Sequence, residues 1–170
     1  ANIYRRLVGK LIYLTVTRPD ITYTVGLLSQ FMHSPQEIHW HAALRVLVYL
    51  KHAPGRGLLY QHHGHLRVEG YSDSGYAGDR GDRKSTSGFC ILVGGNLVTW
   101  RSQKQRVVSL SSAEAEYRGM THTSSEMLWV RSLLQELGFP VQEAMPMYCD
   151  NQAAIFLSLI HISEPTRLRR

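Results

Sequence analysis

Residues 111–117, Ser-Ser-Ala-Glu-Ala-Glu-Tyr, open the segment that decides the fold of this chain. Ser111 followed by Glu114 is typical of a helix N-terminus, because each side chain can bond backbone N–H groups at that end. Apolar residues then recur at helical spacing as far as Gly138, a residue type that commonly ends a helix. The sequence therefore predicts a long helix over residues 112–137.

Two glutamates in the first turns of this helix have different expected roles. Glu114 can reach back to the N-terminal cap, and it precedes Arg118 by one helical turn, so we expect it to be structural. Glu116 shares a face with Ala113 and Met120, the face expected to pack on a sheet. A carboxylate on a buried face needs a partner, and a metal ion is a good one. Glu116 is therefore the candidate functional residue.

Strand-like segments lie on both sides of the helix. Alternating or continuous apolar patterns predict strands over residues 66–73, 88–93, 97–100, 106–110 and 145–149. Gly94-Gly95-Asn96 predicts a tight hairpin turn, and residues 103–105 predict a second turn. A further helix should follow Asp150. We therefore predict an α+β (mixed α/β) fold, whose mixed sheet has antiparallel first strands and flanking helices.

The first part of the chain has a different pattern. Apolar residues at helical spacing predict helices over residues 4–12, 21–32 and 34–50, with Pro19 at a first helical position. Ser34, Pro35 and Glu37 predict a capping box at the start of the third helix. Residues 52–65 read as a connector containing a short strand. The sequence thus predicts a small helical segment, residues 1–60, ahead of the sheet-containing part.

Asp73 and Asp150 each lie within or at the end of a predicted strand, and Glu116 lies on the helix between them. Carboxylates that converge from separate elements can hold a pair of metal ions for phosphodiester hydrolysis. Hard oxygen ligands favour Mg²⁺ or Mn²⁺. The alternative is that Asp73 and Asp150 are ordinary turn residues at strand ends.

Several motifs, in order, resemble the Pol polyproteins of copia-type LTR retrotransposons. They are Tyr71-Ser72-Asp73, Arg83-Lys84-Ser85-Thr86-Ser87-Gly88-Phe89-Cys90, residues 94–100, residues 111–117 and Tyr148-Cys149-Asp150-Asn151-Gln152. Residues 4–9, 17–21 and 39–51 resemble the end of the reverse transcriptase and its connection to RNase H. The resemblance covers about residues 4–156 and is specific, because so many motifs occur in order.

The resemblance implies an RNase H-like domain over residues 61–156, preceded by the segment 1–60 that links it to the reverse transcriptase. It implies cleavage of the RNA strand of an RNA–DNA hybrid with Mg²⁺ or Mn²⁺, by Asp73, Glu116 and Asp150 as metal ligands. The reverse transcriptase domain of the same polyprotein would be a partner. The expected location is intracellular, in a cytoplasmic virus-like particle or the nucleus.

The net charge of +6 suits a surface that binds a polyanion. Hybrid contacts are expected from Arg83, Lys84 and Lys104 to phosphates, and from Ser74 and Asn151 to 2′-hydroxyls. A solvated charged face is the alternative. No run of residues reaches transmembrane length, and the two cysteines fit a reducing compartment, as small apolar strand residues.

The family has a fourth carboxylate on a later helix, and this chain has no counterpart. Residues 157–167 resemble the translation of a transposase-based sequencing adapter, so we expect residues 157–170 to be a non-native tail on a truncated domain. A divergent C-terminus is the alternative. Because the chain begins with Ala1, we expect a fragment of a longer product. A catalytically dead remnant that binds nucleic acid or is only structural therefore competes with an active enzyme. An integrase-type nuclease fits less well, because Glu116 precedes Asp150.

Overall fold

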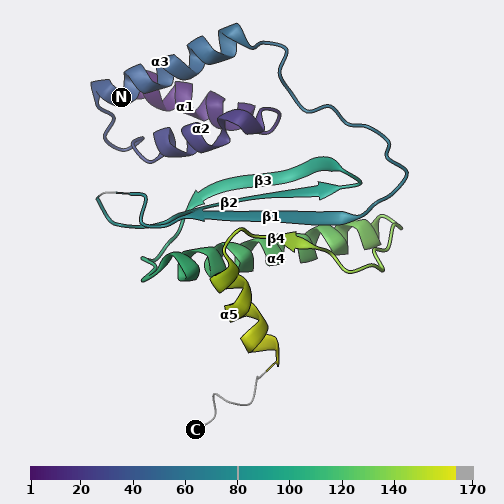
Figure 1. Ribbon diagram of the computed structural model, residues 1–170. Coiled ribbons are helices and arrows are strands. Elements are labelled where there is room, and N and C mark those ends of the chain that lie inside the picture. Colours follow the sequence, from purple (N-terminus) through teal and green to yellow (C-terminus); the bar gives the residue numbers. More distant parts are fainter. Residues whose placement is uncertain (80, 164–170) are drawn as a thin grey trace. The chain divides into compact units, whose positions relative to one another are not determined.

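The computed structural model describes residues 1–79 and 81–163, and they form two compact units, Ala1–Leu59 and the residues from Tyr60 onward (Figure 1). Residues 164–170 of the predicted non-native tail lie outside the described residues. The elements, in order, are α1 (Asn2–Leu14), η1 (Pro19–Ile21), α2 (Thr22–Ser29), α3 (Glu37–His52), β1 (Val68–Gly75), β2 (Thr86–Val93), β3 (Asn96–Lys104), α4 (Ser112–Glu136), β4 (Met147–Tyr148) and α5 (Gln152–Ser163).

The first unit is a helical cluster built on the apolar stripes of α1, α2 and α3. Val8 and Val25 are at most 1% exposed, and Ala43 of α3 packs in the same cluster. Burying a valine side chain contributes about 1.5–3 kcal/mol. The buried Tyr4 hydroxyl donates to the carbonyl oxygen of Leu28 at 2.7 Å, which ties α1 to the end of α2. The predicted helical segment is thus held by both apolar packing and a buried hydrogen bond.

The start of α3 differs from the prediction. Ser34 and Pro35 are not helical, and the N-cap is Gln36, whose backbone N–H donates to Nδ1 of His39 at 3.0 Å. Gln36 has extended backbone angles, so the helix begins at Glu37 instead of at Pro35. The predicted Ser34 capping box is therefore wrong, because a different pair of side chains satisfies the first backbone groups.

The second unit contains a four-stranded mixed sheet in the order β3-β2-β1-β4. β1, β2 and β3 are antiparallel neighbours, and β4 pairs parallel to β1. Figure 1 shows α4 running along one face of this sheet. Val68, Ile91, Met127 and Val130 form the core between the sheet and α4. The predicted α+β class with a mixed sheet is confirmed, and the arrangement is compatible with an RNase H-like fold.

Gly94 and Gly95 form the predicted hairpin turn between β2 and β3. Both have positive φ, 57° and 74°, and Val93 pairs with Asn96 across the turn. A two-residue turn with positive φ at both positions suits the twist of the flanking strands, and glycine adopts it without strain. A Cβ at Gly94 would collide with the carbonyl oxygen of His65.

Two predicted strands are absent from the described residues. Residues 106–110 form no strand, because β3 continues without a turn to Lys104 and the chain then bends toward α4. The connector before β1 contains no strand either. It is instead held to the hairpin by side chains, since Asn96 Nδ2 donates to Gln61 O at 2.8 Å and His63 Nδ1 lies 2.7 Å from Gly94 O.

Candidate functional site

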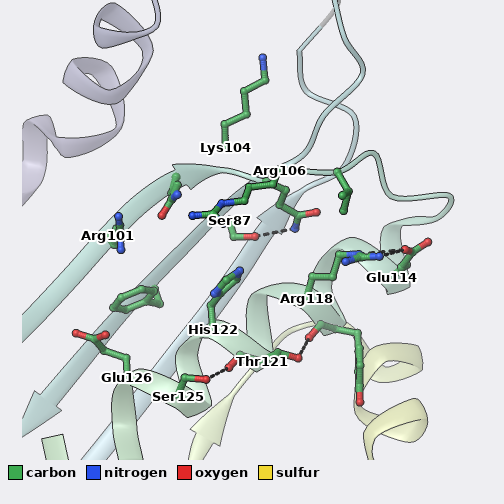
Figure 2. A pocket seen from close by; sticks show the side chains of 15 residues that line it. Ser87, Arg101, Lys104, Arg106, Glu114, Arg118, Thr121, His122, Ser125 and Glu126 are labelled. Atoms are coloured by element: carbon green, nitrogen blue, oxygen red, sulfur yellow. Dashed lines mark hydrogen bonds and ion pairs between the residues drawn. The ribbon is translucent and has the colours of Figure 1, made fainter. Parts of the chain in front are cut away.

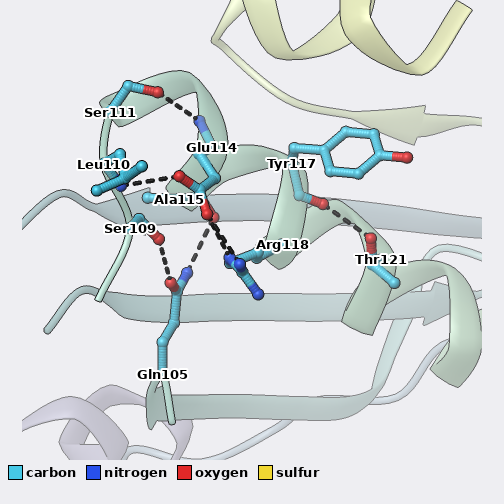
Figure 3. Close-up of polar contacts among 9 residues, drawn as sticks. All are labelled: Gln105, Ser109, Leu110, Ser111, Glu114, Ala115, Tyr117, Arg118 and Thr121. Carbon is cyan, nitrogen blue, oxygen red and sulfur yellow. Dashed lines mark hydrogen bonds and ion pairs between the residues drawn. The ribbon is translucent and has the colours of Figure 1, made fainter. Parts of the chain in front are cut away.

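Glu114 and Glu116 occupy the positions that helix geometry predicted. Ser111 Oγ accepts the backbone N–H of Glu114 at 3.1 Å, and Glu114 Oε2 accepts the N–H of Leu110 at 2.8 Å (Figure 3). Arg118 completes this surface arrangement with an ion pair to Glu114 at 2.8 Å. The Leu110 N–H and Arg118 lower the pKa of Glu114. Glu114 is thus structural, as expected.

Glu116 faces the sheet and is 5% exposed. Its Oε1 accepts the backbone N–H of Ser74 at 3.0 Å, and Cys149 Sγ lies 3.7 Å from its Oε2. Burial raises the pKa of Glu116, and the negative charges of Asp73 and Asp150 raise it further. The carboxylate is therefore held in place in an environment that disfavours its own charge.

The two aspartates lie on, or directly after, neighbouring strands of the sheet. Asp73 lies on β1, and Asp150 follows β4, which pairs parallel to β1. Both aspartates are exposed, whereas Glu116 is buried. Ligand atoms of Glu116, Cys149 and Asp150 all lie within 4.8 Å of one another. Asp73 is outside that group but acts on Glu116 electrostatically.

Cys149 and Gln105 have contacts that sequence reasoning missed. On the sequence alone, Cys149 is interpreted as a small apolar strand residue. Its place next to Asp150 could have indicated that it lies close to the carboxylates. Burial raises the pKa of its thiol. Gln105, in a predicted turn, is buried, and its Nε2 donates to Ser87 Oγ at 2.8 Å and to Ala115 O at 2.9 Å. It ties the end of β3 to the start of α4 (Figure 3). No periodic pattern could have identified it.

The predicted nucleic-acid contacts fall in different surroundings. Ser74 is buried, and its Oγ lies 2.9 Å from Ser87 Oγ. Asn151 caps α5, since its Oδ1 accepts the N–H of Ala154 at 3.0 Å. The predicted phosphate contacts lie on or beside the turn that joins β1 to β2, and they are Arg83, Lys84 and Lys104. Arg83 there is exposed and has a positive φ of 57°.

Lys84 and Lys104 share a small acidic cluster at that turn. Lys84 lies 3.7 Å from Asp82, and Lys104 pairs with both Asp79 and Asp82, at 2.5 and 2.9 Å. The Lys104 ammonium and two backbone N–H groups lower the pKa of Asp79 to about 2. Asp79 and Asp82 are therefore turn residues, and they offset the charges of both lysines.

The chain is similar to three retrovirus-related Pol polyproteins from plant transposons. It is 46% identical to that of transposon RE2 and 47% identical to that of RE1, both of Arabidopsis thaliana, over 154 residues in each case. It is 41% identical to that of TNT 1-94 of Nicotiana tabacum over 156 residues. Each alignment covers 91% of this chain and 10–12% of the polyprotein, so the chain spans about a tenth of these relatives.

No protein-family model and no solved structure matches the chain. Among the described helices, none is both long and apolar enough to cross a bilayer. The ordered motifs, the mixed α/β architecture and the identity across nearly the whole chain agree with one another. The chain belongs to the retrovirus-related Pol polyproteins of copia-type transposons, of which it is a fragment.

Proposed function

We propose that this module hydrolyses the RNA strand of RNA–DNA hybrids. The observation that carries the proposal is Glu116, a carboxylate that is 5% exposed and lies where the charges of Asp73 and Asp150 act on it. An ordinary structural glutamate would be paired with a cation, as Glu114 is with Arg118. A buried carboxylate on which the charges of two others act instead suits a site that accepts positive charge.

The side chains present fit Mg²⁺ or Mn²⁺. Asp73, Glu116 and Asp150 offer hard oxygen atoms. Burial and the charges of Asp73 and Asp150 raise the pKa of Glu116, and a divalent ion would offset those charges. When bound, such ions activate water and stabilise the leaving oxygen of a phosphodiester. The Ser74 N–H fixes the orientation of Glu116, and the parallel pairing of β1 with β4 brings the strand that carries Asp73 next to the strand that Asp150 follows.

The hybrid itself would be bound near the turn between β1 and β2. Arg83 is the best placed of the predicted phosphate contacts, because it is exposed and no described residue forms an ion pair with it. Lys84 and Lys104 would have to exchange their aspartate partners for phosphates. Under this proposal the module acts beside the reverse transcriptase of the same polyprotein, in a cytoplasmic virus-like particle or the nucleus.

A labelled RNA–DNA hybrid incubated with the purified chain and Mg²⁺ tests the proposal. We expect slow cleavage of the RNA strand that Asp73→Asn abolishes, whereas Glu136→Gln, at an exposed acid at the end of α4, leaves it unchanged. We also expect Mg²⁺ to raise the melting temperature of the chain but not that of Glu116→Gln. The proposal would be contradicted if the chain neither cleaved the RNA strand nor gained stability from Mg²⁺.

A second candidate is a remnant that binds hybrids without cutting them. It is favoured by α5, because residues 151–163, which follow Asp150, contain no aspartate or glutamate to act as the family's fourth carboxylate. Fewer carboxylates would weaken one of the metal sites. This candidate predicts salt-sensitive binding of the hybrid that survives Asp73→Asn, with no cleavage by either protein. Brisk cleavage by the unmodified chain would exclude it.

A further inference from the structure

A groove of about 730 Å³ lies between the β2–β3 hairpin and the N-terminal half of α4 (Figure 2). Phe89 and Arg101, which pair across β2 and β3, line it from the sheet side. Arg118, His122 and Ser125 line it from α4. Arg106, beyond the end of β3, also lines the groove. The groove is therefore walled by two separate elements of the same unit.

This groove is separate from the carboxylate site. Arg118, His122 and Ser125 recur at helical spacing and lie on one face of α4. Glu116 precedes Arg118 by two positions, about 200° around a helix, and it points to β1 instead. None of Asp73, Glu116 and Asp150 lines the groove. A ligand in the groove would thus contact none of the three proposed metal ligands, and of the predicted hybrid contacts it would meet Lys104 alone.

The groove has a positive lining that internal ion pairs do not cancel. Four cationic side chains and two carboxylates line it. Arg118 is paired with Glu114, and Lys104 is paired with aspartates and extends away from the other labelled cations in Figure 2. No described residue forms an ion pair or hydrogen bond with the guanidinium groups of Arg101 and Arg106, and both residues are exposed. These two arginines are available to an anionic ligand.

Flat ring faces lie beside these charges. The His122 ring is exposed on α4, and the half-buried Phe89 ring lines the opposite wall. A basic groove interleaved with aromatic rings is typical of sites for single-stranded nucleic acid, because unpaired bases stack on rings while cations follow the phosphates. An acidic peptide would use the arginines but gain little from the rings.

We propose that this groove binds single-stranded nucleic acid. Phosphates contact Arg101 and Arg106, and an unpaired base lies against the ring of His122. The site adds a binding function to the module that does not depend on hydrolysis of a hybrid. It would hold a strand that is not part of the duplex at the carboxylate site.

Fluorescence anisotropy of a labelled oligothymidylate, titrated with the full chain in EDTA over a series of salt concentrations, tests the proposal. We expect Arg101→Gln and Arg106→Gln each to reduce the slope of log affinity against log salt by about 0.7, the value for one phosphate of a single strand. His122→Ala should weaken binding at least about fivefold without changing the slope. Arg101→Lys should keep the slope.

Arg131→Gln is the matched control, since Arg131 is an exposed cation of α4 that does not line the groove. Unchanged slopes in both arginine variants would overturn the proposal. An equal loss of affinity for an intact RNA–DNA duplex would overturn the assignment to single strands. Binding of polyglutamate, but not of the oligonucleotide, would overturn the assignment to nucleic acid. Because EDTA removes divalent ions, these outcomes are independent of whether the carboxylate site cleaves.

Discussion

Glu114 and Glu116 show how strongly surroundings decide what a glutamate does. They lie two positions apart in α4 and so project from nearly opposite sides of the helix. The Leu110 N–H and Arg118 lower the pKa of Glu114, whereas burial raises the pKa of Glu116. One carboxylate stabilises the helix N-terminus. The other is charged at neutral pH only at a cost to the folded state.

Neutralising Glu116 should therefore stabilise the protein while removing a proposed metal ligand. Glu116→Gln keeps an oxygen for the Ser74 N–H, and we expect it to raise the melting temperature at neutral pH by about 4 °C, equivalent to roughly 1 kcal/mol. A raised pKa in the folded state means that this difference is absent below the ordinary pKa of glutamate and develops as pH rises through the folded value. Thermal unfolding at several pH values measures it, and a lower melting temperature at neutral pH would contradict it.

Asp20 has the opposite electrostatic role in the helical unit. Arg18, whose side chain is 6% exposed, donates to both carboxylate oxygens of Asp20, and the Tyr49 hydroxyl donates to Oδ2 at 2.7 Å. Arg18 also donates to Ala53 O at 3.0 Å. The Arg18 hydrogen bonds lower the pKa of Asp20 to about 2. A charged network thus links η1 to the end of α3.

Asp20→Asn should destabilise the helical unit by about 2 kcal/mol, because it leaves the Arg18 guanidinium without its charged acceptor. A lowered pKa means that the stabilisation is present above the ordinary pKa of aspartate and is lost as pH falls toward about 2. Urea unfolding at pH 7 and pH 3 measures both effects. Equal stability of the two proteins at pH 7 would show that the ion pair contributes nothing.

Gly119 sets how closely α4 approaches the sheet. A Cβ at this position would collide with Ser74 Oγ and lie 3.1 Å from Ser72 Oγ. Both serines are buried, and Ser74 also holds Glu116 through its backbone N–H. The depth at which α4 packs therefore determines the position of the proposed ligand Glu116.

Gly119→Ala should destabilise the sheet-containing unit by about 1–3 kcal/mol through overpacking, although alanine favours helices. Gly9→Ala is the control, because no atom lies within 4 Å of a Cβ there, and we expect it to stabilise α1 by up to about 1 kcal/mol. Chemical unfolding of both variants makes the comparison. Stabilisation by both substitutions would mean that α4 can move outward freely.

Local signals predicted most elements, and tertiary contacts explain the exceptions. The Ser111 cap and Gly138, which has φ 85°, bound α4 as expected, because both act within one turn of the helix. The Ser34 cap was wrong because His39 bonds the Gln36 N–H instead. Glu116 was predictable from helix periodicity. The contact of Cys149 with Glu116 was only hinted at by its place next to Asp150, because it depends on the pairing of two strands far apart in the sequence.

At the scale of the molecule, the chain consists of two compact units with separate cores. Tyr4, Val8 and Val25 belong to one core, and Val68 and Ile91 belong to the other. We therefore expect each unit to have a stability of its own. A substitution should therefore act only within its own unit.

Hydrogen exchange tests this independence. We expect Asp20→Asn to accelerate backbone exchange within residues 1–59 and to leave β1, β2 and α4 unchanged, whereas Gly119→Ala should do the reverse. The physical reason is that the altered contacts of each variant lie within one core. Loss of protection in both units after either substitution would reveal that they unfold cooperatively.

The position of β3 at the edge of the sheet has a consequence for self-association. It is nine residues long and pairs on one side with β2, so its other side could template the addition of a strand from another copy. Charged side chains such as Arg101 and Lys104, together with the bulge between Ile91 and Leu92, discourage such pairing. Arg101, which we propose binds nucleic acid, would thus also protect the chain from aggregation. Nucleic acid bound in the groove would mask that protective charge.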